Sequence, residues 1–204
     1  CLSDWSSDVC SSDLKSGMSA GKSAGKTLTC DVAIVGSGPT GMTIANLLGQ
    51  AGVNVILIER NATTVTQPRA VSIDDEALRT MQAIKLDREV IENVALDYGS
   101  NYFTPAGICF AKVEPTTREY GFPRRNAFTQ PKLEATLREH LARYPQVMQL
   151  FEHECESVTE NESGVVLRLR HAGADVVVEA SYVVGADGAR STLRKVDRKS
   201  TRLN

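Results

Sequence analysis

The sequence lacks the cysteine patterns of a metal-binding or disulfide-stapled protein. Its five cysteines are odd in number and scattered, and none belongs to a Cys-x-x-Cys pair. Neither a zinc site nor a disulfide framework is therefore indicated. No apolar run approaches the roughly 18 residues that a membrane-spanning helix needs, and the N-terminus lacks the apolar core of a secretory signal. These absences favour a cytoplasmic protein without a membrane partner.

A strong charge imbalance is missing as well. The formal net charge is −2 and no long basic run occurs, so nucleic acid is not indicated as a partner. The three histidines have no carboxylate or cysteine at ligand spacing, and a surface position is expected for each. The acidic cluster at residues 74–76 is expected to mark a helix N-terminus, which favours such side chains without any metal. No metal ligand and no catalytic side chain is predicted.

The two ends of the chain look foreign to the rest. Residues 1–17 have no helical or strand periodicity and precede Met18, and the tail, residues 197–204, interrupts an expected helix. Both ends resemble translated sequencing-adapter read-through, and ordinary extensions are the alternative. We interpret them as non-native flanks that pack against nothing. Residues 18–29, rich in Ser, Gly and Lys, are expected to form a flexible leader.

The most informative segment, residues 31–60, predicts a strand, a glycine turn, a helix and a second strand. Its glycines stand at G-x-G-x-x-G spacing after an apolar run: Gly36, Gly38 and Gly41. In such a motif the first glycine permits the tight turn, the second lets a pyrophosphate approach the backbone, and the third lets the helix pack closely. Pro39 suits the first helical turn, and Glu59, at the tip of the next strand, is placed to accept hydrogen bonds from a ribose. The segment predicts a site for an ADP-containing dinucleotide.

The rest of the chain predicts further helices and two kinds of strand. Helices are expected over residues 74–82, 87–93 and 130–143. A third parallel strand is expected over residues 147–151, and two short strands between residues 97 and 111. Alternating apolar residues predict an antiparallel meander over residues 157–159, 165–170 and 176–179. A separate buried strand is expected over residues 182–184, leading into the segment GADGARS.

Four segments, taken in order, carry a resemblance to a known family. They are GSGPTG with Glu59, PRAVSIDDEALRTMQ, FTQPKLEATLREHL and GADGARSTLR. In these segments the chain resembles the N-terminal part of class A flavoprotein monooxygenases, the FAD-dependent aromatic hydroxylases. The first segment occurs in many flavoproteins, whereas Asp187-Gly188 followed by Ser191 and Arg194 is the hallmark of this group. The second segment is most similar to hydroxylases of 3-(3-hydroxyphenyl)propionate and related phenols.

The resemblance implies an α/β fold over residues 30–196. It consists of a Rossmann-like FAD-binding domain with a parallel sheet, an antiparallel β-meander and part of a substrate-domain sheet. The first part of the substrate-binding region would lie at about residues 95–128. Family members continue with a substrate-binding sheet and a second Gly-Asp motif, and neither follows Arg194 here. The chain is therefore interpreted as an N-terminal fragment.

The resemblance also implies a set of cofactor-binding residues. They are Gly36, Gly38, Pro39, Thr40, Gly41, Glu59, Arg60, Arg69, Gln130 and Asp187. Arg69 would lie along the ribose and phosphates, Gln130 would reach the ribityl chain, and Asp187 would bind at the ribityl–pyrophosphate end. The alternatives are a solvent-exposed loop arginine for Arg69 and a helix cap for Gln130. Arg190 either adds positive charge to the site or packs the turn.

By the same resemblance, the activity implied is that of an FAD-dependent monooxygenase. Such an enzyme uses NAD(P)H and O2 to hydroxylate a phenolic aromatic substrate through a flavin C4a-hydroperoxide, and the cofactor carries the difficult chemistry. The fragment alone is expected to be inactive. Two alternatives stay open: a non-hydroxylating FAD-dependent oxidoreductase, and a nonenzymatic dinucleotide-binding fragment. The expected partners are a small aromatic substrate and O2, and the oligomeric state is left open.

Overall fold

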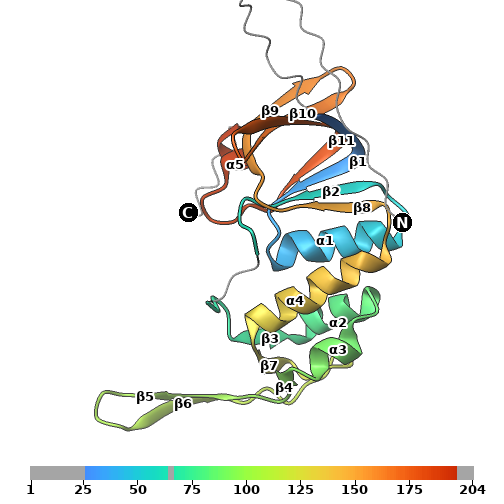
Figure 1. Cartoon of the computed structure of the whole chain (residues 1–204). Helices are drawn as coiled ribbons and strands as arrows, with labels where there is room; N and C mark the ends of the chain where they lie inside the picture. The colour runs from blue at the N-terminus through green and yellow to red at the C-terminus, as the bar shows by residue number, and fades with distance from the viewer. Residues whose placement is uncertain (1–25, 64–66, 197–204) are drawn as a thin grey trace, which may run out of the picture.

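A six-stranded mixed sheet forms the centre of the protein. The computed structural model describes residues 26–63 and 67–196 (Figure 1). The strand order is β8-β2-β1-β11-β10-β9, and the first four strands run parallel. The strands are β1 (Lys26–Val35), β2 (Val55–Ile58), β8 (Val147–Leu150), β9 (Glu154–Asn161), β10 (Gly164–His171) and β11 (Ala174–Gly185). The predicted α/β architecture with an antiparallel meander is confirmed.

Alternate residues of β1 and β2 feed two hydrophobic cores on opposite faces of the sheet. Ile34 and Leu57 face the helices, where they join Met42 and Leu137 in one buried cluster. Their strand neighbours face the other way and pack against the meander: Ala33, Val35, Ile56 and Ile58 with Leu167, Leu169 and Val178. β2 and the last three residues of β1 are buried on both faces, as their continuous apolar runs predict.

The helices lie in successive layers on one face of the sheet, and the meander curls over the other (Figure 1). They are α1 (Pro39–Gln50), α2 (Asp75–Ala83), α3 (Asp87–Ile91) and α4 (Gln130–His140) with a 3-10 turn at Leu141–Arg143. The last helix, α5 (Thr192–Val196), lies instead on the meander side, beside β9 (Figure 1). α1 begins with a proline, which needs no hydrogen-bond partner there. Asp74 caps α2, because its carboxylate accepts from the Ala77 N–H at 2.8 Å. The acidic cluster therefore serves the helix start, as predicted.

Two small antiparallel sheets extend from the helical layer. One has the order β3-β7-β4, formed by β3 (Ser72–Asp74), β7 (Arg125–Phe128) and β4 (Val94–Ala95). The other is a hairpin of β5 (Ser100–Phe103) and β6 (Cys109–Val113) that projects away from the body (Figure 1). This hairpin confirms the two strands predicted between residues 97 and 111. The three short strands β3, β4 and β7 were not predicted.

Two sequence-based expectations need correction. Residues 26–29 are not part of a flexible leader, because β1 begins at Lys26 and pairs with β11 from that residue onward. Residues 182–184 do not form a separate buried strand: they continue β11, and Tyr182 is 71% exposed. The reason is the register, since β10 pairs with β11 only as far as Ala180 and leaves the rest of β11 open on that side. The expectations for residues 1–25 and 197–204 lie outside the described residues.

Within the described residues, no helix combines the length and apolar character needed to cross a lipid bilayer.

Candidate cofactor-binding site

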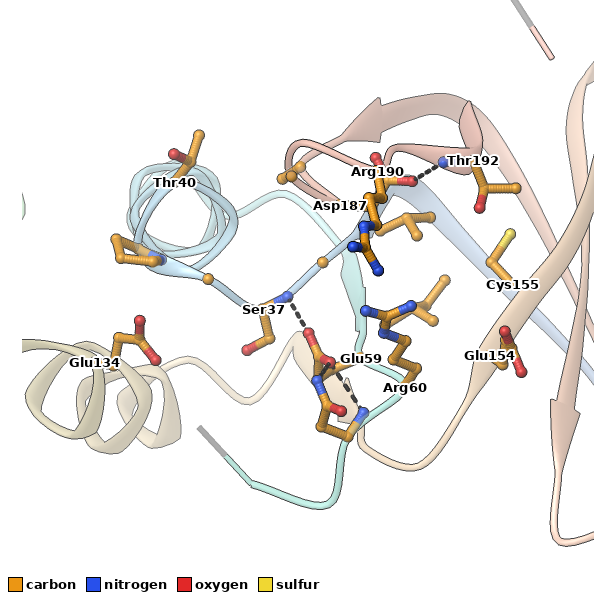
Figure 2. Close-up of a pocket in the computed structure, with 18 of the residues that line it drawn as sticks. Ser37, Thr40, Glu59, Arg60, Glu134, Glu154, Cys155, Asp187, Arg190 and Thr192 are labelled. Atoms are coloured by element: carbon orange, nitrogen blue, oxygen red, sulfur yellow. Dashed lines mark hydrogen bonds between the residues drawn. The ribbon is translucent and has the colours of Figure 1, made fainter. Parts of the chain in front are cut away.

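A cleft opens where β1, β2 and β11 end at their carboxyl termini, the usual ligand site of an open α/β sheet. It is lined by nearly all of the predicted residues: Gly36, Gly38, Pro39, Thr40, Glu59, Arg60, Arg69, Gln130 and Asp187. The remaining one, Gly41, packs behind the turn. Figure 2 shows the cleft between the start of α1 and the β11 end, with side chains converging from both sides. The predicted convergence of Gly38 and Asp187 on one crevice is confirmed.

The three glycines of the turn differ in the space around them. Gly36 has φ +106°, and an added Cβ would lie 2.3 Å from the Ala186 carbonyl oxygen. At Gly41 an added Cβ would lie 1.9 Å from the Gly36 carbonyl oxygen, so only glycine lets α1 approach the turn. At Gly38 an added Cβ would meet no atom within 4 Å. Gly36 and Gly41 are thus required by the fold, whereas Gly38 leaves space beside the backbone for a ligand.

The N-terminus of α1 faces this space without a side-chain cap. Gly38 is the N-cap residue, and no side chain there accepts a hydrogen bond from the first helical turn. The first N–H groups of a helix have no partner within the helix, and the helix dipole is positive at that end. The turn therefore offers donors and a positive potential, which suit a phosphate group.

Glu59 fixes the turn from the tip of β2. One carboxylate oxygen accepts the Ser37 N–H at 2.9 Å, and the other accepts from the backbone and side-chain nitrogens of Asn61 at 2.9 and 2.6 Å. Figure 2 shows these bonds as dashed lines. Oε2 accepts only the Ser37 N–H and keeps a second acceptor site, so a ribose hydroxyl can still bind. Glu59 is at the predicted strand tip and on the same side as Gly38.

Asp187 holds the opposite wall of the cleft. Its Oδ2 accepts the backbone N–H groups of Thr192 and Leu193 at 2.6 and 3.3 Å, which ties the turn after β11 to α5. Its Oδ1 and the Ser37 hydroxyl are buried without a hydrogen-bond partner among the described residues. Buried polar atoms are normally paired. Two unpaired ones in the wall of a single cleft make that wall complementary to a polar ligand such as a dinucleotide.

Three arginines place positive charge in a cleft whose lining also includes four carboxylates. Arg60, Arg69 and Arg190 all line it, and each is exposed. Figure 2 shows the side chains of Arg60 and Arg190 extending into the cleft, Arg60 from the loop after β2 and Arg190 from the turn after β11. In the described part of the chain, none of the three forms a salt bridge. Arg194 instead donates to the carbonyls of residues 188 and 189 at 2.9 and 3.1 Å, so it packs the turn.

Gln130 is buried at the start of α4 and is not a helix cap. Its Oε1 accepts the backbone N–H groups of Arg69 and Ala70 at 2.8 and 2.9 Å. Its Nε2 donates to the Glu134 carboxylate at 2.8 Å. The alternative of a cap is therefore wrong, because α4 begins after Thr129 with no side-chain cap. Sequence reasoning missed Glu134, although its place one turn after Gln130, beside buried Leu133, marks it as inward-facing.

The histidines correct another expectation. His140 is 5% exposed, and its Nδ1 lies 2.7 Å from Oδ1 of buried Asn46, whose amide donates to two carbonyls, one on α1 and one on α4. A surface position was wrong because His140 is three residues after Leu137 and shares the apolar face of α4. Burial and the charge of Arg143 lower the pKa of His140, while Glu89 opposes them.

The other two histidines are half-buried and stack on each other, and His153 lines the cleft. Their rings are 4.2 Å apart and nearly parallel. Two parallel rings cannot direct their in-plane lone pairs at one ion. Within residues 26–63 and 67–196, no cluster of three or more His, Cys, Asp and Glu side chains is placed to hold a metal.

A cysteine also lines the cleft, but its thiol is held in the neutral form. Burial, followed by the charges of Asp187 and Glu156, raises the pKa of Cys155 to about 11. Only the thiolate is an effective nucleophile. Cys30, Cys109 and Cys155 are all free in the described part of the chain. The thiol of Cys155 is therefore not activated as a nucleophile in this cleft.

The segment that forms the cleft matches a known protein family. Residues 29–199 match the family model described as the FAD binding domain. The chain belongs to this FAD-binding family. It is 43% identical over 168 residues to a 3-(3-hydroxy-phenyl)propionate/3-hydroxycinnamic acid hydroxylase of Klebsiella pneumoniae, and 42% identical over 165 residues to that of Escherichia coli K12. The match to the Klebsiella protein covers 82% of this chain and 30% of the relative, and the match to the Escherichia coli protein covers 80% and 30%.

Solved structures give the same family. The p-nitrophenol 4-monooxygenase of Pseudomonas putida DLL-E4 superimposes with a TM-score of 0.76 at 25% identity, over 83% of this chain and 43% of that one. The flavin-dependent monooxygenase PieE, solved with FAD and substrate, gives a TM-score of 0.73 at 26% identity, over 82% and 32%. The resemblance to FAD-dependent aromatic hydroxylases drawn from the sequence is confirmed, and so is FAD as the cofactor of the family. The chain spans about 30% of the length of its curated relatives.

Proposed function

We propose that this chain is the cofactor-binding part of an FAD-dependent aromatic hydroxylase that acts on a small phenol with NAD(P)H and O2. The observation that carries the proposal is the convergence of the glycine turn, Glu59 and Asp187 on one polar cleft. The relatives named as hydroxylases of 3-(3-hydroxy-phenyl)propionate supply the substrate class. The proposal includes a cytoplasmic location and no nucleic-acid or membrane partner.

The cleft supports a definite placement of FAD. The backbone of Gly36–Gly38 and the N-terminus of α1 would hold the pyrophosphate, with Pro39 and Thr40 forming the first turn of that helix. Glu59 would bind the adenosine ribose, and Asp187 would bind at the ribityl end. Arg60, Arg69 and Arg190 would add positive charge around the phosphates, where a guanidinium is suited to forked hydrogen bonds.

When bound, FAD would supply the redox and oxygen chemistry of this function. The protein's own residues bind and orient the cofactor. Asp187 braces the turn after β11, and Glu59 braces the glycine turn, so both walls of the cleft are formed before a ligand enters. No side chain in the cleft is assigned a proton-transfer role, in keeping with the neutral thiol of Cys155.

A second candidate function is FAD binding without turnover by the chain in isolation. The chain covers only 30% of its relatives' length, and we infer that the residues enclosing the reactive ring belong to the remainder of those proteins. We propose that the 204-residue chain binds FAD through its ADP half and does not hydroxylate a phenol alone.

Titration with flavins tests cofactor binding. The purified chain should bind FAD saturably, seen as a change in flavin fluorescence, and ADP should compete because the cleft is built for the ADP half. FMN, which lacks that half, should bind at least tenfold more weakly. Equal binding of FMN and FAD would contradict the placement.

A chimera tests the reaction. Residues 29–196 would replace the aligned part of the Klebsiella hydroxylase, and oxygen uptake dependent on 3-(3-hydroxyphenyl)propionate would be measured with product analysis. We expect a hydroxylated product. A chimera that binds FAD and oxidises NAD(P)H but hydroxylates no phenol would favour the non-hydroxylating oxidoreductase. The parental Klebsiella enzyme is the control.

A further inference from the structure

A buried carboxylate stands behind the cleft and is linked to it by hydrogen bonds. Glu134 on α4 is 2% exposed, yet it lines the cleft wall. Its Oε1 accepts from Gln130 Nε2 at 2.8 Å, and Gln130 in turn accepts from the backbone of Arg69 and Ala70. The Glu134 carboxylate, the Gln130 amide and the backbone of residues 69 and 70 thus form a continuous chain of hydrogen bonds, the relay, from the buried face of α4 to the segment that carries Arg69.

The carboxylate sets the orientation of the Gln130 amide. A carboxylate accepts hydrogen bonds and does not donate them, so the NH2 group of Gln130 must face Glu134. Its carbonyl oxygen is then left to face the two backbone N–H groups. If the amide were reversed, its NH2 group would oppose those N–H donors and leave them unpaired, which is costly in a buried site. Glu134 therefore orients Gln130 so that its carbonyl oxygen anchors the backbone of Arg69 and Ala70 to α4.

The anchor fixes the part of the chain where an exposed arginine borders the cleft. Arg69 lies three residues before β3, and its side chain is exposed at the cleft. The backbone then enters the small sheet, where Phe128 N–H donates to the Val71 carbonyl at 3.1 Å. The two bonds from Gln130 thus place Arg69 relative to α4, and α4 is fixed to α1 through buried Asn46.

We propose that Glu134 is a positioning residue for cofactor binding. It acts through Gln130 to hold the Arg69 segment at the cleft. The segment is then already ordered before FAD binds, and the Arg69 guanidinium can meet the FAD phosphates. This inference rests on the proposed function, because it requires FAD as the ligand. A preordered binding group raises affinity by removing an entropic cost.

Substitutions at Glu134 test the relay on the full chain. Glu134→Leu removes the acceptor, whereas Glu134→Gln retains an oxygen that can accept from Gln130. Glu139→Leu is the matched control, since it makes the same change at an exposed position of the same helix. We expect Glu134→Leu to weaken FAD binding about tenfold, equivalent to roughly 1.4 kcal/mol. Glu134→Gln and Glu139→Leu should stay within threefold of the wild type.

Two further measurements separate positioning from a general structural role. Amide hydrogen exchange should accelerate at Arg69 and Ala70 in Glu134→Leu, and not in Glu134→Gln. In an Arg69→Ala background, Glu134→Leu should weaken FAD binding less than twofold, because the group it positions is gone. Additive losses in the double variant, or unchanged exchange at both amides, would overturn the inference while leaving the proposed function intact. A wild-type chain that fails to bind FAD would instead overturn the proposed function and the inference with it.

Discussion

Two alanine substitutions in one glycine turn should have opposite consequences. In Gly41→Ala the new Cβ would lie 1.9 Å from the Gly36 carbonyl oxygen and 3.3 Å from the Ala186 side chain. Ordinary contacts lie at about 3.5 Å, so α1 must withdraw by roughly 1.5 Å. In Gly38→Ala the new Cβ meets nothing within 4 Å, and the φ of −80° suits alanine.

The expected stability changes follow from these contacts. Overpacking of a closely packed site costs about 1–3 kcal/mol, and a clash with backbone belongs at the upper end. For a folded unit of this size, about 3 kcal/mol corresponds to a Tm lowered by roughly 6–12 °C. Gly38 is an N-cap residue, where replacing glycine by alanine costs about 0.5 kcal/mol, or roughly 1–2 °C.

The expected changes in FAD affinity distinguish Gly38→Ala further from Gly41→Ala. Gly38→Ala places a methyl group where the pyrophosphate would approach the backbone, so FAD affinity should fall at least tenfold with the fold intact. Thermal unfolding and flavin titration of the same samples give both quantities. Gly52→Ala is a control with an open Cβ position away from the cleft, though its φ of +80° predicts some backbone strain. A Gly41→Ala variant that melts within 2 °C of the wild type would refute the steric argument.

Three other changes are also testable. Asp187→Ala should weaken FAD binding about tenfold in flavin titration, because the turn after β11 loses its tie to α5 and the cleft loses the carboxylate proposed to meet the ribityl end; unchanged affinity would exclude Asp187 from the site. Burial, together with Arg143, lowers the pKa of His140, so the unfolding free energy should be highest above pH 6.5 and should fall as the pH drops below 6.5. The difference between the unfolding free energies measured by denaturant titration at pH 7.5 and pH 5.5 should be smaller in His140→Gln than in the wild type. With its pKa of about 11, Cys155 should react with iodoacetamide at pH 8 at least tenfold more slowly than exposed Cys109, and peptide mapping that finds equal rates would contradict its burial.

Local patterns account for what the sequence predicted well. The glycine spacing, the apolar run before it and the acid at the next strand tip are all set by contacts within about 30 residues, and they placed Gly36, Gly38 and Glu59 correctly. Asp187 was predicted from a family segment, and its position follows because β11 ends at the same sheet edge as β1. The start of α4 at Gln130 was also predicted.

Long-range side-chain partners account for what was missed. The link from Gln130 to Arg69 joins groups 61 residues apart, and no spacing rule connects an amide on a helix to the backbone of a remote loop. The burial of His140 had a local signal in the leucine stripe of α4, but its partner Asn46 is 94 residues away. The extension of β1 to Lys26 depends on β11 as a neighbour, because β11 pairs with β1 from Lys26 onward whereas β2 pairs with it only from Val32.

The pairing of β1 with β11 sets the order in which the protein can acquire its shape as it leaves the ribosome. Val35 and Gly185 are sheet partners, although 150 residues separate them. At a synthesis rate of about 5–20 residues per second, the first half of the cleft waits roughly 8–30 s for the second. During that interval FAD has only one wall to bind and cannot act as a template. One edge of β1 therefore stays without its sheet partner until β11 has been made.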